Sequence, residues 1–247
     1  PIEAAYVLNG VEERQSEARF DGDRLIVSCG RFAPSTYLVK LRPSDIRLDA
    51  PSSLPVELPC NDYAFTADAF NRQGNLDGKG NSYAAELLPE RIVSEGVAFR
   101  VSGDVARRNV VKCDGQRIAL PQGGYDRVYL LAASLDGDRD AEFTVDGKPF
   151  RRTVPYYSGF FGQWGHDGEP GYVKDGDLAY VGTHRHSAER GNDPYVFTYM
   201  YKICLPVGAG AKELVLPEDR NVAVFAVTVS DNPNDCLSPL NEIRALP

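Results

Sequence analysis

Short runs of apolar and β-branched residues recur along this chain, separated by glycine, proline and aspartate. The run at 129–133 is apolar throughout, which predicts a strand covered on both faces, whereas the alternation at 222–229 predicts a strand with one face in water. The runs that predict strands are 24–29, 37–41, 97–101, 109–113, 127–133, 141–145, 179–183, 196–203, 214–216 and 222–229. Because no window keeps a long 3.6-residue apolar period, helix should be scarce, with one turn near 84–88.

Tight-turn signals lie between these runs. Asn9-Gly10 is one such signal, and Asp-Gly occurs seven times, beginning at Asp21, Asp77, Asp114, Asp136, Asp146, Asp167 and Asp175. Glycine supplies the positive φ that such turns need, and Asp can hydrogen-bond to its own backbone. Strands at a spacing of about ten residues, joined by turns of this kind, predict an all-β, antiparallel β-sandwich or jelly roll.

A proline-rich segment divides the chain. Residues 43–59 contain four prolines and little periodicity, which predicts an extended linker. Residues 1–42 are hairpin-sized and too small for a core of their own, so we expect them to be the terminal hairpin of an upstream β-sandwich. Residues 60–232 then form one accessory β-sandwich domain, and 233–247 form a C-terminal tail.

Composition and charge limit the classes of partner that we expect. Hydrophobic residues make up 43% and charged residues 25% of the chain, which is typical of a globular protein. The net charge is −8, without a block of like charges, so we expect no nucleic-acid partner. The longest apolar run, at 222–229, is too short to span a bilayer, so we expect no membrane partner either.

The five cysteines are dispersed and odd in number, and they lack metal-finger spacing. They are Cys29, Cys60, Cys113, Cys204 and Cys236. We expect mostly free thiols, with one isolated pair as the alternative, and we expect Cys29 and Cys204 to be buried within strands. This pattern leaves the redox compartment open.

His184-x-His186 places two imidazoles on one face of an extended segment, because side chains alternate along a strand. The interpretation that we favour is structural, with both histidines and Arg185 bonded to internal groups. A second interpretation is contact with glycan or another domain, where the Arg185 fork would meet sugar hydroxyls. A third is a zinc site, whose further ligand would come from His166, Glu189 or Asp193.

Residues 156–164 form the densest aromatic patch, ending at Trp164. We favour a core or interface role for these rings. The alternative is a sugar-stacking platform, since the glycines that flank Trp164 predict a loop.

Glu86 lies among apolar residues and is expected to be buried, as a structural carboxylate rather than a general acid. The loop at 75–81 resembles a calcium loop but lacks the EF-hand ligand ladder, so an Asp-Gly turn is favoured over calcium.

Several segments occur in an order that resembles a known family. They are 6–13 (YVLNGVEE), 23–27 (DRLIV), 32–41 (FAPSTYLVKL), 80–89 (GNSYAAELLP), 113–116 (CDGQ), 127–133 (RVYLLAA), 162–164 (GQW), 183–186 (THRH), 214–217 (LVLP) and 224–228 (VFAVT). The first three resemble the last hairpin of the β-supersandwich in class II α-mannosidases, glycoside hydrolase family 38. The others resemble the extra C-terminal β domain of bacterial members, for which we expect a galactose-binding-like sandwich.

The resemblance implies that an upstream catalytic domain, lying before Pro1, hydrolyses terminal α-mannosides with retention. That domain would hold zinc through His and Asp and supply a carboxylate nucleophile, so no catalytic residue, metal ligand or cofactor is assigned to this chain. We therefore expect a non-catalytic accessory domain whose partners are the catalytic domain and mannose-containing glycans, in a periplasmic or other extracytoplasmic location. The candidates for contact with sugar or with the catalytic domain are Trp164, His184, Arg185, His186, Asn192 and Tyr195.

Two other functions are possible on the same residues. One is a free-standing carbohydrate-binding module with Trp164, Tyr156 and Tyr157 as its platform. The other is a small metal-dependent hydrolase that uses His184, His186 and a carboxylate. Glycan affinity that is lost on Trp164→Ala would favour the carbohydrate-binding module. Stoichiometric zinc with chelator-sensitive hydrolysis would favour the metal-dependent hydrolase.

Overall fold

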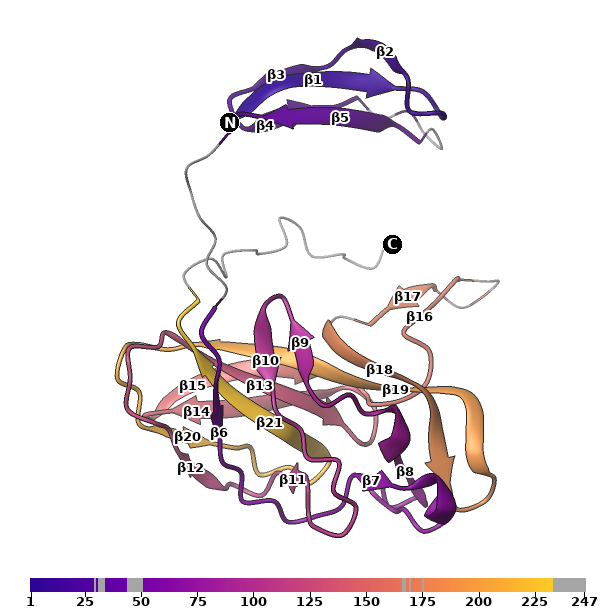
Figure 1. The fold of residues 1–247 in the computed structure, drawn as a ribbon, viewed down its shortest axis with the longest axis vertical. Helices are drawn as coiled ribbons and strands as arrows, with labels where there is room; N and C mark the ends of the chain where they lie inside the picture. Colours follow the sequence, from indigo (N-terminus) through magenta and orange to yellow (C-terminus); the bar gives the residue numbers. More distant parts are fainter. Residues whose placement is uncertain are drawn as a thin grey trace. The chain divides into compact units, whose positions relative to one another are not determined.

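The structure is a computed structural model that describes residues 1–28, 30, 34–43, 51–165, 168, 170–174 and 176–232. Its regular elements are almost all strands, so the all-β prediction is confirmed. The exceptions in the described part are two single-turn 3-10 helices, η1 (Asp68–Phe70) and η2 (Ala85–Leu87), and η2 is the turn expected near 84–88. The chain forms two compact units, residues 1–49 and 50–247 (Figure 1).

The first unit consists of a three-stranded sheet and a two-stranded ribbon. Its strands are β1 (Ile2–Leu8), β2 (Arg14–Glu17), β3 (Arg19–Asp21), β4 (Arg24–Ile26) and β5 (Thr36–Leu41). β1 lies between β2 and β5, and β3 pairs with β4 across a turn at Gly22 and Asp23. The side-chain oxygen of Asn9 accepts hydrogen bonds from the backbone N–H groups of Val11 and Glu13, so this short polar side chain organises the turn between β1 and β2.

The second unit is built around an eight-stranded sheet (Figure 1). In spatial order the sheet contains β11 (Val111–Lys112), β21 (Val222–Ser230), β13 (Arg127–Ser134), β19 (Gly191–Pro206), β18 (Asp177–Ser187), β8 (Asn81–Ala84) and β7 (Phe65–Thr66), and β6 (Leu54–Val56) also pairs with β21. All of these pairs are antiparallel except that of β7 with β8. β6 lies within the segment expected to be a linker, so the sandwich begins before residue 60.

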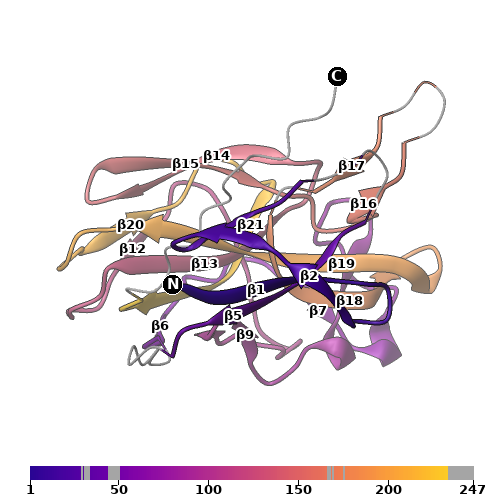
Figure 2. The same ribbon diagram turned by 90° about the horizontal axis from the view of Figure 1, so that it is seen from above.

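A four-stranded sheet forms the second layer. It contains β12 (Arg117–Ala119), β20 (Glu213–Val215), β14 (Arg139–Val145) and β15 (Lys148–Val154), and the remaining ribbons are β9 (Ile92–Ser94) with β10 (Val97–Phe99) and β16 (Gly162–Gln163) with β17 (Tyr172–Val173). Asp146 and Gly147 join β14 to β15 with φ values of 47° and 78°, the positive pair that a two-residue hairpin turn requires. β14 and β15 run alongside β13 and β19 (Figure 2).

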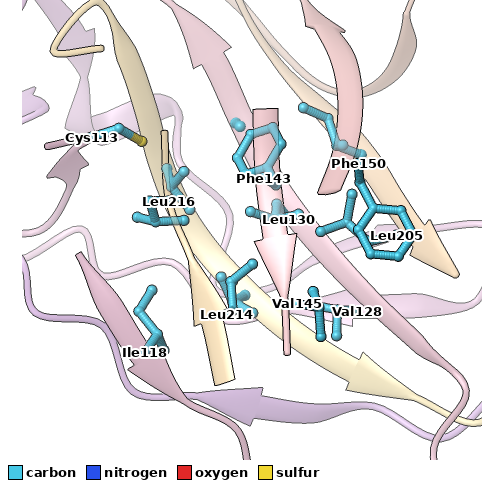
Figure 3. Packing of buried hydrophobic residues seen from close by; sticks show 14 of the residues in the cluster. Cys113, Ile118, Val128, Leu130, Phe143, Val145, Phe150, Leu205, Leu214 and Leu216 are labelled. Carbon is cyan, nitrogen blue, oxygen red and sulfur yellow. The ribbon is translucent and has the colours of Figure 1, made fainter. Parts of the chain in front are cut away.

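The core has two halves, one on each face of the large sheet. Along β13, Val128, Leu130 and Ala132 enter the cluster between the two sheets, and the intervening residues 129, 131 and 133 enter a second cluster on the opposite face. Leu130 lies beside Phe143 of the four-stranded sheet (Figure 3). The prediction that 129–133 is covered on both faces is therefore confirmed.

β21 differs from the sequence expectation, because it has no face in water. All nine of its residues are buried. Val222 and Val224 pack in the cluster between the sheets, while Phe225 packs on the opposite face with the rings of Phe65 and Tyr83. The prediction that one face of 222–229 lies in water is therefore wrong, since strands distant in the sequence cover both faces.

Three of the five cysteines, Cys60, Cys113 and Cys204, lie within the described residues. Cys60 and Cys113 are free thiols, and Cys113 is fully buried, which raises the pKa of its thiol. Cys204 is partly buried rather than buried as expected. Cys29, Cys236 and the tail at 233–247 lie outside the described residues.

Among the described residues, no helix has the length and apolar character that crossing a membrane would need.

Candidate functional site

Three ionisable side chains converge where β18 passes β8. His184 and His186 lie two residues apart on β18, and Glu86 lies on η2, directly after β8. The antiparallel register pairs His186 with Ser82 and Arg185 with Tyr83, which carries the chain from β8 into η2 beside the two imidazoles. The pairing of β8 with β18 therefore brings together residues about a hundred positions apart in the sequence.

One carboxylate oxygen links the two rings. Glu86 Oε1 lies 3.0 Å from His186 Nε2 and 3.3 Å from His184 Nε2. The ring centroids of the two histidines are 5.5 Å apart. The ligand atoms of all three residues lie within 4.8 Å of one another, which is a spacing that could hold a metal ion.

The three residues differ in burial, and a hydrogen-bonded chain supports the most buried one. The side chain of His186 is fully buried, whereas those of His184 and Glu86 are 20% and 36% exposed. His186 Nδ1 lies 2.8 Å from the hydroxyl of Thr66, which lies 2.7 Å from the hydroxyl of Ser82. The expectation that Glu86 is buried is wrong, because η2 is a surface turn and its carboxylate reaches the histidines from the solvent side.

Arg185 points away from this cluster and is bonded internally. Its Nε and Nη2 donate to Asp193 Oδ2 at 3.1 and 3.0 Å, and the Asp193 side chain is only 4% exposed. Arg190 donates to the other oxygen of Asp193 at 3.3 Å. These bonds occupy the Arg185 fork with a buried carboxylate, as the structural interpretation of this residue requires.

Asn192 also has internal partners. Its amide donates to Asp68 Oδ1 at 2.8 Å, and its carbonyl oxygen accepts from Asn71 at 2.7 Å. These bonds tie the start of β19 to η1 and to Asn71 directly after it, so Asn192 orders the edge of the site.

Tyr195 is presented to solvent at an irregular point of the sheet. His184 pairs with Pro194, and the register between β18 and β19 shifts between Gly182 and His184, so extra β19 residues bulge out there. Tyr195 lies on this bulge with φ of 61° and is 83% exposed. A non-glycine residue at positive φ is strained, and such strain tends to occur at functional sites.

Trp164 lies apart from these residues. It is 94% exposed, in the loop between β16 and β17. That ribbon leads into the start of β18, whereas His184 and His186 occupy the other end of the strand (Figure 1). Of the same aromatic segment, Tyr157 is fully buried and Phe160 is 66% exposed, so the segment divides between core and surface.

A buried tyrosine borders the cluster. Burial raises the pKa of Tyr180 to about 12, and the charge of Glu86 adds to the shift. Its hydroxyl, like that of Thr198, has no hydrogen-bond partner among the described residues. Glycine at position 182 avoids a steric clash, because a Cβ there would lie 3.0 Å from the Tyr180 hydroxyl oxygen and even closer to that of Thr198.

The loop at 75–81 is organised by protein donors. Asp77 accepts from the backbone N–H of Lys79 and from the backbone and side chain of Asn81, and the Tyr157 hydroxyl donates to it at 2.8 Å. Asn75 accepts from the N–H of Gly80. Since both carboxylate oxygens of Asp77 are used within the protein, the geometry favours the turn over a calcium site.

From the sequence, Glu86 and the histidine pair are separate candidates, and their contact was not predicted. Of the proposed third ligands, Asp193 is bonded to Arg185, Glu189 is exposed on the turn after β18, and His166 lies outside the described residues. A strand at 81–84 was not predicted, since Asn81 and Ser82 are polar. Without that strand, nothing in the sequence placed Glu86 beside β18.

The comparisons with known proteins agree with this fold. A family model described as an AziU2-like beta-sandwich domain matches residues 52–233, which is most of the chain. No curated protein matches the chain. The matched range starts just before β6 and ends just after β21, so it coincides with the sandwich. The chain therefore belongs to the AziU2-like β-sandwich domain family.

Proposed function

We propose that this chain is a non-catalytic accessory β region of a larger glycan-degrading enzyme, of the class II α-mannosidase type that its segments resemble. In this role it buttresses a zinc-dependent catalytic domain elsewhere in the same polypeptide and contacts mannose-containing glycan. The parent enzyme would act on terminal α-mannosides with retention, in the periplasm or another extracytoplasmic space.

The observation that carries the buttressing role is the apolar surface of the first unit. Among its described residues, the buried hydrophobic side chains are those of Ile2 and Ala5 alone. Its large exposed apolar side chains are those of Val11, Phe20, Ile26, Val27, Leu38 and Leu41. A sheet this small buries too little apolar surface to be stable by itself, and exposed apolar surface of this kind is typical of packing against another part of a protein.

The environment of Glu86 supports a non-catalytic role. A glycosidase needs two carboxyl groups on opposite sides of the scissile bond, about 5 to 9 Å apart. The carboxylate oxygen of Glu86 is instead within hydrogen-bonding distance of the imidazoles of His184 and His186. We therefore place hydrolysis on the catalytic domain.

Tyr195 and Trp164 support glycan contact. Both rings are more than four-fifths exposed, although burial of an aromatic ring is strongly favourable. A ring held in water can stack on the C–H face of a sugar. We assign the main contact to Tyr195, because a bulge holds it at a strained φ beside the polar residues of β18.

The buttressing role is tested on the longer polypeptide and on the isolated chain in parallel. Leu41→Asp, at a position 67% exposed in the first unit, should lower the Tm of the longer polypeptide and leave that of the isolated chain unchanged. Val181→Asp, at a position 47% exposed on the sandwich, is the matched control and should change neither. Equal effects of Leu41→Asp in both settings, or a coding sequence that lacks an upstream glycosidase domain, would contradict the buttressing role.

The glycan role is tested by calorimetry with α-linked mannobiose. We expect Tyr195→Ala to weaken binding about three- to tenfold, as the loss of one aromatic contact implies. Phe160→Ala, which removes another exposed ring, should leave the affinity unchanged. Binding that is insensitive to Tyr195→Ala but lost in Trp164→Ala would favour a free-standing module with the Trp164 platform. Turnover of an aryl α-mannoside by the chain alone would refute the non-catalytic role.

A further inference from the structure

We infer that Glu86, His184 and His186 bind a divalent transition metal ion, with Zn²⁺ the best match, and that the metal keeps at least one coordination position open to solvent. This site does not depend on the accessory role proposed above.

The two distances from Glu86 to the histidines match the spacing of ligand atoms around a zinc ion. Zinc bonds to imidazole nitrogen and carboxylate oxygen measure about 2.0 to 2.2 Å, so neighbouring ligand atoms lie about 3.0 to 3.4 Å apart in octahedral or tetrahedral geometry. Glu86 Oε1 lies 3.0 and 3.3 Å from the Nε2 atoms of His186 and His184. These two separations fit a shared ion, and all three ligand atoms lie within 4.8 Å of one another.

The donor types also match. Two neutral imidazoles and one carboxylate are a common ligand set of open zinc sites and of the facial triad that binds Fe²⁺. Hard cations such as Ca²⁺ and Mg²⁺ prefer oxygen ligands, so they fit this site less well. One carboxylate offsets part of the charge of a divalent ion, which two histidines alone would leave uncompensated.

His186 has the outer support that metal-binding histidines usually show. Its Nδ1 lies 2.8 Å from the hydroxyl of Thr66, which is in turn held by Ser82. If Nδ1–H donates to Thr66, the lone pair of Nε2 points toward Glu86. A lone pair facing a carboxylate oxygen at 3.0 Å is repulsive unless a cation lies between them. Without metal, the alternative tautomer removes this repulsion, with Nε2–H donating to Glu86 and Thr66 donating to Nδ1.

The burial pattern permits both rigidity and access. His186 is fully buried and fixes the site within the sheet, whereas the 36% exposed carboxylate of Glu86 gives ions and water a route in. Water would therefore complete the coordination sphere from the solvent side.

The test is metal binding by the whole chain after chelation. Titration of the metal-free chain with Zn²⁺ in a calorimeter should give one site per chain. Glu86→Gln and His184→Ala should each weaken binding at least tenfold, and Thr66→Val should weaken it about 10- to 100-fold, as loss of an outer hydrogen bond typically does. The matched control is Glu189→Gln, which makes the same change at an exposed position on the turn after β18 and should leave the affinity unchanged.

Circular dichroism of each variant verifies that it is folded, and Glu86→Gln keeps the shape of the side chain. The inference is overturned if the folded chain takes up no stoichiometric zinc, because the cluster is then a hydrogen-bonded structural element only. It is also overturned if zinc binds but the affinity is unchanged in both Glu86→Gln and His184→Ala, which would place the ion elsewhere.

Discussion

Replacement of Arg185 by methionine separates a structural role for this residue from a glycan-binding role. Arg185 makes two bonds to Asp193, whose side chain is 4% exposed. Removing one partner of a buried ion pair costs about 3 to 5 kcal/mol, because the remaining charge stays buried. Arg185 is itself 22% exposed, and Arg190 still reaches Asp193, so we expect a loss of about 2 to 3 kcal/mol in the free energy of unfolding.

The measurement is urea unfolding, followed by far-UV circular dichroism. Arg190→Met is the control, and its cost should be below about 1 kcal/mol, since that side chain is 66% exposed. A double-mutant cycle of Arg185→Met with Asp193→Asn should give a coupling energy of at least about 1 kcal/mol. If Arg185→Met leaves the unfolding free energy within about 0.5 kcal/mol of the parent while abolishing glycan binding, the structural assignment is refuted.

Three further predictions concern the core and its ionisable groups. Phe143→Ala, which opens a cavity between the two sheets, should cost about 3 to 5 kcal/mol in urea unfolding, whereas Phe160→Ala on the surface should cost less than about 0.5 kcal/mol; equal losses would contradict the packing. Cys113 should resist a thiol reagent in the folded chain and react once urea unfolds it, because burial raises its pKa; rapid native labelling would show that it is accessible. The free energy of unfolding should fall above about pH 10, because phenols ionise in the unfolded chain while Tyr180, with its pKa raised to about 12, keeps its proton in the folded chain. Tyr180→Phe should make this decline with pH less steep, and an unchanged pH dependence would contradict this cause.

Local patterns were sufficient to predict much of the fold. Asp146-Gly147 has the turn chemistry that its hairpin uses, and the apolar run at 129–133 is covered on both faces, as its composition indicates. The covering of β21 could not be predicted in the same way, because alternation within a strand does not reveal a second layer supplied by distant strands. β6 could not be predicted for a similar reason, since it pairs with β21, which lies at the other end of the domain's sequence.

The candidate site was only half accessible from the sequence. The two-residue period of a strand predicts that His184 and His186 share a face. Their meeting with Glu86 depends on the pairing of β8 with β18, which is a long-range contact that a local pattern does not encode. Asp193 lies closer in sequence to the histidines, but its carboxylate neutralises Arg185 instead.

The convergence of Glu86, His184 and His186 is tested most directly by zinc-edge X-ray absorption on the chain loaded with one equivalent of Zn²⁺. We expect two imidazole nitrogens at about 2.0 to 2.1 Å from the zinc, with oxygen completing the coordination and no sulfur. The imidazole scattering should diminish in His184→Ala. Sulfur at about 2.3 Å would instead place the metal on cysteine thiolates, and oxygen alone would place it on surface carboxylates. Either result would show that Glu86, His184 and His186 do not bind the ion.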